Sequence, residues 1–143
     1  MSVTKYFKPY TFSKDGKRVR ITLEKTGAGV YFIQQKDFWG DWKTVYIGYS
    51  GADVRKTMIR HFQKWTDKRH PNTKRVQRIE RVTYWYKGIT NEEINKEYRV
   101  RVLFCGSADR AERLERFCIL KFKPRDNSQK LALEAEGELS QAK

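Results

Sequence analysis

Glu115 is the side chain best suited to bind a metal ion, because its helical neighbours are unusual for an acidic residue. Ala111 and Cys118 lie one turn away on its face, and Phe122 follows one turn later. No Lys or Arg stands three or four residues away, where a surface glutamate usually finds its partner. Two alternatives therefore stay open: a salt bridge to a distant arginine, or a hard cation such as Mg²⁺ or Mn²⁺.

His61 is a second candidate for chemistry. It lies at the edge of an apolar stripe formed by Val54, Met58, Phe62 and Trp65. A histidine in this position is most simply a packed residue at the edge of the core. Beside Arg60, however, it could serve a phosphate group, since arginine binds phosphate with two hydrogen bonds and histidine transfers protons.

Two tyrosines occupy short strand-like segments, Tyr31 in GVY (29–31) and Tyr46 in YIG (46–48). Aromatic and β-branched residues are typical of strands, so packing within a sheet is the default interpretation of both. Each tripeptide alone is a weak signal, because such tripeptides recur by chance.

Taken in order along the chain, the motifs form one constellation. GVY is followed by YIG, then by Arg60-His61 in a helical segment, then by Glu115 in the segment ERFCILKFKPRDN that ends at Asn127. This constellation resembles the GIY-YIG nuclease family over residues 28–131. The ending from Glu115 to KPRDN is the most specific part, since residue types and spacing both match.

The resemblance implies a mechanism. Tyr31 would lie beside the scissile phosphate, and Tyr46 would act as general base or orient the nucleophile. His61 would assist proton transfer, and Glu115 would be the single protein ligand of a divalent metal ion, Mg²⁺ or Mn²⁺. Asn127 would tie the loop after the second site helix back to the site. The implied products carry a 5′-phosphate and a 3′-hydroxyl.

One position departs from the family pattern. The family usually has an arginine four residues before the histidine, where this chain has Thr57. A threonine cannot neutralise a phosphate. Arg60 lies on the same helical edge and is the candidate replacement, so it joins the expected catalytic residues.

The net charge points to a polyanionic partner. The 143 residues carry a formal charge of +14. Residues 132–143 contain three Glu and one Lys, so residues 1–131 carry +16, two more than the whole chain. Nucleic acid, and DNA in particular, is the expected partner. A generic basic protein is the plain alternative, and an acidic membrane surface is disfavoured because no basic amphipathic helix stands out.

The residues expected to bind nucleic acid flank the site motifs. Such contacts are mostly with phosphates, so affinity should fall steeply with salt and carry little sequence information. No separate DNA-binding module is recognisable. The expected contacts are Lys64, Lys68, Arg69, Lys74, Arg75, Lys123 and Arg125.

The compartment is expected to be intracellular and reducing, in the cytoplasm. No apolar run approaches the ~18 residues of a membrane helix, and the first residues lack the apolar core of a signal peptide. Cys105 and Cys118 are the only cysteines, so a zinc site is not expected and a disulfide is disfavoured.

Periodicity predicts the elements that must position these residues. Residues 29–49 read as an antiparallel hairpin, residues 52–65 and 108–122 as helices, and residues 81–88 and 97–105 as further strands. Asp53 or Ser50 would cap the first helix, Ser107 would cap the second, and Pro124 would end it. Residues 66–75 read as a basic loop and residues 89–96 as a turn.

This order predicts an α+β fold with a small central antiparallel sheet flanked by helices, as in the GIY-YIG nucleases. The expected organisation is an N-terminal extension at 1–26 with an edge strand at 18–25, a nuclease-like domain at 27–131 and a flexible tail at 132–143.

Three functions remain in competition. The first is a metal-dependent DNA endonuclease from a phage, a mobile element or a repair system, in which double-strand cleavage would require a homodimer or two successive events. The second is a nuclease fold that binds nucleic acid without cutting it, suggested by Thr57. The third is a protein that condenses nucleic acid by charge alone, and the retained set of site residues argues against it.

Overall fold

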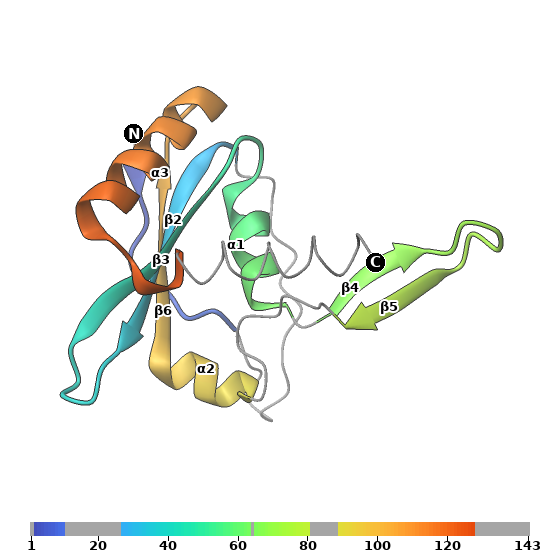
Figure 1. Ribbon diagram of the computed structural model, residues 1–143, viewed down its shortest axis with the longest axis horizontal. Helices are drawn as coiled ribbons and strands as arrows, with labels where there is room; N and C mark the ends of the chain where they lie inside the picture. The colour runs from blue at the N-terminus through green and yellow to red at the C-terminus, as the bar shows by residue number, and fades with distance from the viewer. Residues whose placement is uncertain (1, 11–26, 64, 81–88, 128–143) are drawn as a thin grey trace, which may run out of the picture.

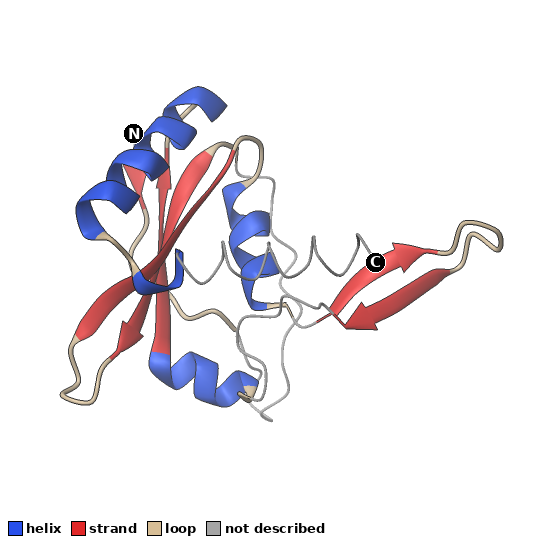
Figure 2. Ribbon diagram, viewed as in Figure 1, coloured by secondary structure: helices blue, strands red, loops and turns tan. Residues whose placement is uncertain are grey.

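The computed structural model describes residues 2–10, 27–63, 65–80 and 89–127. These residues form two antiparallel sheets and three helices (Figures 1 and 2). The elements in chain order are β1 (Ser2–Val3), β2 (Gly29–Lys36), β3 (Trp42–Ser50), α1 (Val54–Phe62), β4 (Trp65–Arg69), β5 (Val76–Glu80), α2 (Asn91–Glu97), β6 (Tyr98–Phe104) and α3 (Ala108–Phe122).

The central sheet has the strand order β1-β6-β2-β3, and all of its pairs are antiparallel. The expected hairpin is confirmed, with β2 paired to β3 through a turn at residues 37–41. In this register Tyr31 lies opposite Gly48 on one side and Val102 on the other. β3 is thus the edge strand of the described sheet, next to the strand that carries Tyr31.

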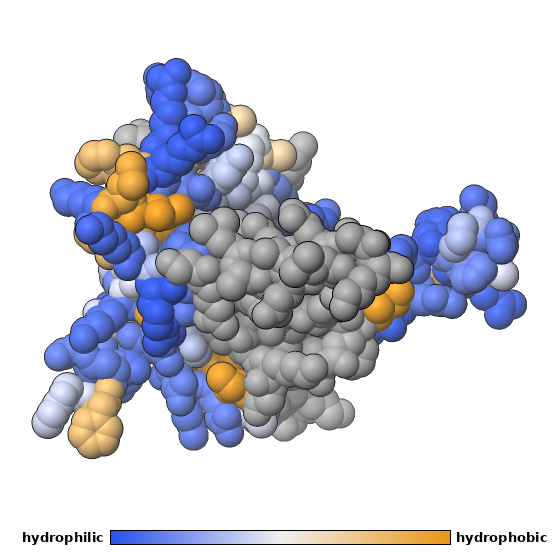
Figure 3. Space-filling model, in the orientation of Figure 1, coloured by the Kyte–Doolittle hydropathy of each residue, from blue (hydrophilic) through white to orange (hydrophobic). Residues whose placement is uncertain are grey.

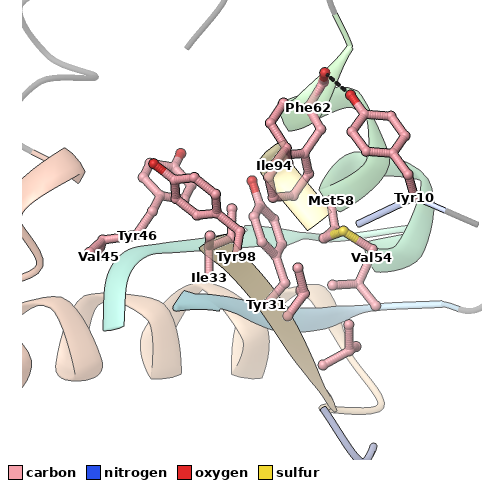
Figure 4. Packing of buried hydrophobic residues seen from close by; sticks show 12 residues of the cluster. Tyr10, Tyr31, Ile33, Val45, Tyr46, Val54, Met58, Phe62, Ile94 and Tyr98 are labelled. Carbon is pink, nitrogen blue, oxygen red and sulfur yellow. Dashed lines mark hydrogen bonds between the residues drawn. The ribbon is translucent and has the colours of Figure 1, made fainter. Parts of the chain in front are cut away.

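Helices cover both faces of the sheet, which confirms the expected α+β class. On one face, α1 and α2 pack with a large cluster that includes Met58, Phe62 and Ile94 (Figure 4). On the other face, α3 packs through Ala111 and Cys118. Alternation along β2 and β6 separates these two clusters, since successive side chains point to opposite faces. On β3, Val45 and Tyr46 both belong to the first cluster, because the pairing with β2 shifts register there.

The two predicted site helices form with the expected caps. α1 begins after Asp53, whose carboxylate accepts a hydrogen bond from the Lys56 N–H, and Ser50 Oγ accepts one from the Asp53 N–H. α3 begins after Ser107, whose hydroxyl accepts from the Arg110 N–H. The first helix is shorter than predicted, because it ends at Phe62 and Trp65 opens β4 instead.

Two segments were wrongly predicted. The turn expected at 89–96 is α2, a short helix capped by Thr90, whose hydroxyl accepts from the Glu93 N–H. The basic loop expected at 66–75 is strand over residues 66–69, because β4 pairs with β5 as a two-stranded arm. Residues 70–75 form the turn at its tip.

The N-terminal residues contribute to the same fold as residues 27–127. β1 pairs with β6, so it is the described edge strand on that side of the sheet. Tyr10 is buried, and its hydroxyl donates to the Phe62 carbonyl at 2.7 Å, at the end of α1. The strands predicted at 18–25 and 81–88 and the tail at 132–143 lie outside the described residues.

Two expectations from composition can be compared with the structure. Among the described residues, no helix is long and apolar enough to cross a membrane. Cys105 and Cys118 are both buried in the cluster under α3, and neither forms a disulfide. Burial raises the pKa of both thiols above the usual range, so they behave as core residues.

Candidate active site

Three of the predicted site residues meet on one face of the sheet. The ring centroids of Tyr46 and His61 are 4.3 Å apart, those of Tyr31 and Tyr46 are 5.9 Å apart, and those of Tyr31 and His61 are 6.2 Å apart. Tyr31 is only 4% exposed, Tyr46 2% and His61 5%. Two adjacent strands and α1 thus hold two phenols and an imidazole in mutual contact. We call these three residues the Tyr–His cluster.

Gly48 makes room for the Tyr31 side chain. A Cβ atom added at Gly48 would lie 2.3 Å from both the Cζ and the Oη atoms of Tyr31. The phenol ring therefore crosses from β2 over the backbone of β3 at the glycine of YIG. This arrangement explains why the second motif needs a glycine opposite the tyrosine of the first, and it directs the Tyr31 hydroxyl toward the edge strand.

Asn127 is bonded to the strand that carries Tyr46. Its Oδ1 accepts from the Ile47 N–H at 3.0 Å, and its Nδ2 donates to the Ile47 carbonyl at 2.9 Å. The side chain thus pairs with β3 as a neighbouring strand would. It fixes the segment after α3 against the residue that follows Tyr46, which matches the position that the resemblance implies.

Glu115 lies on α3 and is half-buried. α3 packs against Val30 and Ile47, whereas Tyr31 and Tyr46 belong to the cluster on the opposite face. The structure therefore does not place the glutamate within the Tyr–His cluster. A site shared by all of them would lie at the edge formed by β3.

The apolar face predicted around Glu115 is partly present. Ala111 and Cys118 are buried, as expected. Phe122 is 57% exposed at the end of the helix, so its predicted position on the buried face is wrong.

Two ion pairs link other acids of α3 to arginines one turn later in the helix. Arg113 pairs with Asp109 at 3.0 Å, and Arg116 pairs with Glu112 at 2.9 Å, so two basic residues of the helix are engaged by other acids. Mg²⁺ needs only one or two protein carboxylates when substrate phosphate and water complete its shell. The described residues contain no group of three or more His, Cys, Asp or Glu side chains placed to hold a metal.

Thr57, at the position where the family has an arginine, is hydrogen-bonded within α1. The Thr57 hydroxyl donates to the Asp53 carbonyl at 3.1 Å, one turn earlier in α1. It is therefore used within the helix. Arg60 is exposed in the last turn of the helix, next to His61 in sequence but outside the buried Tyr–His cluster.

The predicted nucleic-acid contacts fall into two groups. Four lie on the arm and are exposed, and two lie at the end of α3. Lys123 takes the left-handed conformation that ends α3, with φ 47°. Arg125 donates to Gln35 at 2.7 Å, which links the segment after α3 to β2. The arm residues are Lys68, Arg69, Lys74 and Arg75, whereas Lys64 lies outside the described residues.

Sequence reasoning missed the arm itself. Thr66, Val76 and Ile79 are β-branched residues on either side of a His-Pro-Asn-Thr turn, and this pattern could have predicted a hairpin. Its high charge led instead to the prediction of a loop. The arm changes how the basic residues are presented, because a paired ribbon holds them in fixed positions.

Comparisons with family models, with curated proteins and with solved structures gave no match. The resemblance to the GIY-YIG nucleases therefore rests on the sequence motifs alone.

Proposed function

We propose that this protein is a metal-dependent DNA endonuclease of the GIY-YIG type. The observation that carries the proposal is the contact of Tyr31, Tyr46 and His61, three residues from separate parts of the chain. Packing alone would be served equally well by phenylalanine and leucine. Two phenols and an imidazole in contact can instead accept and transfer protons.

Each residue of the cluster has a role in hydrolysis. Tyr31, which crosses to β3 over Gly48, positions its hydroxyl beside the scissile phosphate. Tyr46 activates or orients the attacking water, and His61, in ring contact with Tyr46, takes part in the proton transfer. Their burial keeps bulk water away, which strengthens the hydrogen bonds made to a bound phosphate.

Glu115 would hold the divalent ion, and Asn127 keeps the following segment against β3. When bound, Mg²⁺ or Mn²⁺ would polarise the phosphate and stabilise the leaving oxygen. The expected products carry a 5′-phosphate and a 3′-hydroxyl. Because the chain would have one such site, cutting both strands would need a homodimer or two successive nicks.

A second candidate function is nucleic-acid binding without cleavage. The observation that favours it is Thr57, whose hydroxyl is bonded within α1 at the position where the family has an arginine. Arg60 would have to supply the missing positive charge from an exposed position. The two candidates share the fold and the basic surface and differ only in activity.

Supercoiled plasmid separates the two candidates. Wild-type protein is incubated with Mg²⁺ or Mn²⁺ beside Glu115→Gln and Glu112→Gln, the latter being a matched control on the same helix. The nuclease proposal predicts nicking by the wild type and by Glu112→Gln, loss of nicking with Glu115→Gln, and inhibition by EDTA. Salt-sensitive DNA binding with no nicking by any protein would support the second candidate.

A further inference from the structure

The arm formed by β4, residues 70–75 and β5 extends away from the body of the protein (Figure 1). In the described part of the chain, its strands pair only with each other. Its visible surface is largely hydrophilic (Figure 3). A two-stranded ribbon is only marginally stable in water on its own, so a projecting one is more useful as a binding element than as support for a core.

The tip of the arm is ordered by its own hydrogen bonds. His70 Nδ1 accepts from the backbone N–H groups of Asn72 and Thr73, both at 3.2 Å. The His70 N–H donates to the Arg75 carbonyl at 2.8 Å, and the Lys74 N–H donates to the His70 carbonyl at 3.0 Å. These bonds fix the turn, so the two strands leave it in a defined register.

The charge of the arm matches a nucleic-acid partner. Its residues 65–80 contain five Lys or Arg against two acids, Asp67 and Glu80, which is a net charge of +3 with His70 neutral. Two apolar side chains are exposed as well, Val76 at 61% and Ile79 at 40%. An exposed apolar side chain such as Ile79 can contact bases and sugars, whereas phosphates alone require only charge.

The register gives the two faces of the arm different character. Lys68 lies opposite Gln77, and Ile79 lies two residues beyond Gln77 on the same face. Arg69 lies opposite Val76 on the other face, and Arg78 lies two residues beyond Val76 on that face. The face with Lys68, Gln77 and Ile79 therefore carries one cation, an amide and an aliphatic side chain, whereas the other face carries two arginines.

We propose that the arm lies in the major groove of duplex DNA with the face of Lys68, Gln77 and Ile79 toward the bases, and that Gln77 contacts base edges. The major groove is about 12 Å wide and admits a two-stranded ribbon, whose strands are about 4.8 Å apart. Glutamine can form two hydrogen bonds to adenine, lysine can donate to guanine, and an aliphatic side chain can contact the thymine methyl group.

The consequence is that the protein has a sequence preference, read away from the Tyr–His cluster. Lys74 and Arg75 at the tip, together with Arg69 on the opposite face, would contact phosphates and fix the depth of insertion. This inference rests on duplex DNA being the partner named in the proposed function. It does not rest on cleavage, because groove binding needs no metal ion.

The test is selection of binding sites from a randomised 20-bp duplex pool in EDTA, where cleavage does not interfere. Wild type is compared with Gln77→Ala and with Val76→Ala, a neutral, exposed neighbour on the opposite face. We expect wild type and Val76→Ala to enrich the same short motif. Gln77→Ala should lose about tenfold in discrimination at one or more positions, with an unchanged dependence of affinity on salt.

Several results would overturn the proposal. One is that the wild type enriches no motif, and another is that both variants change the motif equally. A third is that single-stranded DNA or duplex RNA competes as well as duplex DNA, since the major groove of duplex RNA is too narrow for side chains to read. Equal melting temperatures of the variants and wild type establish that folding is intact. A retained motif without plasmid nicking would refute the nuclease and leave the arm assignment standing.

Discussion

Replacing Gly48 with alanine tests how the sheet places the Tyr31 hydroxyl. The new Cβ atom would lie 2.3 Å from Cζ and Oη of Tyr31, well inside van der Waals contact. The tyrosine ring is packed against Tyr46 and His61, so it cannot move without disturbing them. Overpacking of this kind costs about 1–3 kcal/mol in the free energy of unfolding, or about 3–9 °C in Tm.

The same substitution should abolish nicking although it changes none of the proposed catalytic residues. A displacement of about 1 Å at a reacting group can lower a rate by about 100-fold. Thermal unfolding and plasmid nicking with Mg²⁺ measure the two effects on the same preparation.

A double variant isolates the cause. Tyr31→Ala removes the ring that clashes with the new Cβ atom. In that background, Gly48→Ala should therefore lower the free energy of unfolding much less than it does in the wild-type protein. Nicking should stay absent, because the hydroxyl is gone. An active and fully stable Gly48→Ala protein, or a clash penalty that persists without the Tyr31 ring, would refute the reasoning.

Three further predictions concern the site and its support. If Arg60 supplies the missing charge, Arg60→Ala should lower the rate of nicking by about 100-fold. Adding Thr57→Arg to this variant should restore most of the lost activity. An unchanged rate with Arg60→Ala would show that Arg60 is not part of the site. Asn127→Ala deletes both hydrogen bonds to Ile47 and should lower the free energy of unfolding, measured by urea denaturation, by about 1–3 kcal/mol. An unchanged midpoint of the urea transition would show that these bonds do not stabilise the fold. Burial raises the pKa of Tyr98 to about 12, so the fold favours the neutral phenol. The free energy of unfolding should therefore fall as the pH rises from about 10 to about 12. In a pH series of melting temperatures, Tyr98→Phe should remove this contribution to the fall.

The elements with strong periodicity were predictable from the sequence. The hairpin, α1 and α3 each combine a clear hydrophobic pattern with a turn or a capping residue, and their local signals agree with the final fold. α2 was missed although Thr90 and Glu93 have the spacing of a capping box, because seven residues give too little periodicity to detect. The arm was missed because its charge outweighed its few β-branched residues.

The candidate site was only partly predictable. The motifs predicted which side chains to examine, and the fold brings Tyr31, Tyr46 and His61 into contact. The register that lays Tyr31 over Gly48 depends on pairing between strands, which no local pattern specifies. The position of Glu115 on the opposite face from the tyrosines likewise follows from the packing of α3.

The most direct test of the proposed active site compares Tyr31→Phe with Tyr98→Phe. Both tyrosines are 4% exposed and belong to the same cluster, so each change removes one buried hydroxyl from similar surroundings. Plasmid nicking with Mg²⁺ is measured for both variants and for wild type. A loss of at least about 100-fold for Tyr31→Phe, with Tyr98→Phe close to wild type, is the predicted result. Nicking by Tyr31→Phe at the wild-type rate, or by none of the three proteins, would contradict the assignment of this site as that of a nuclease.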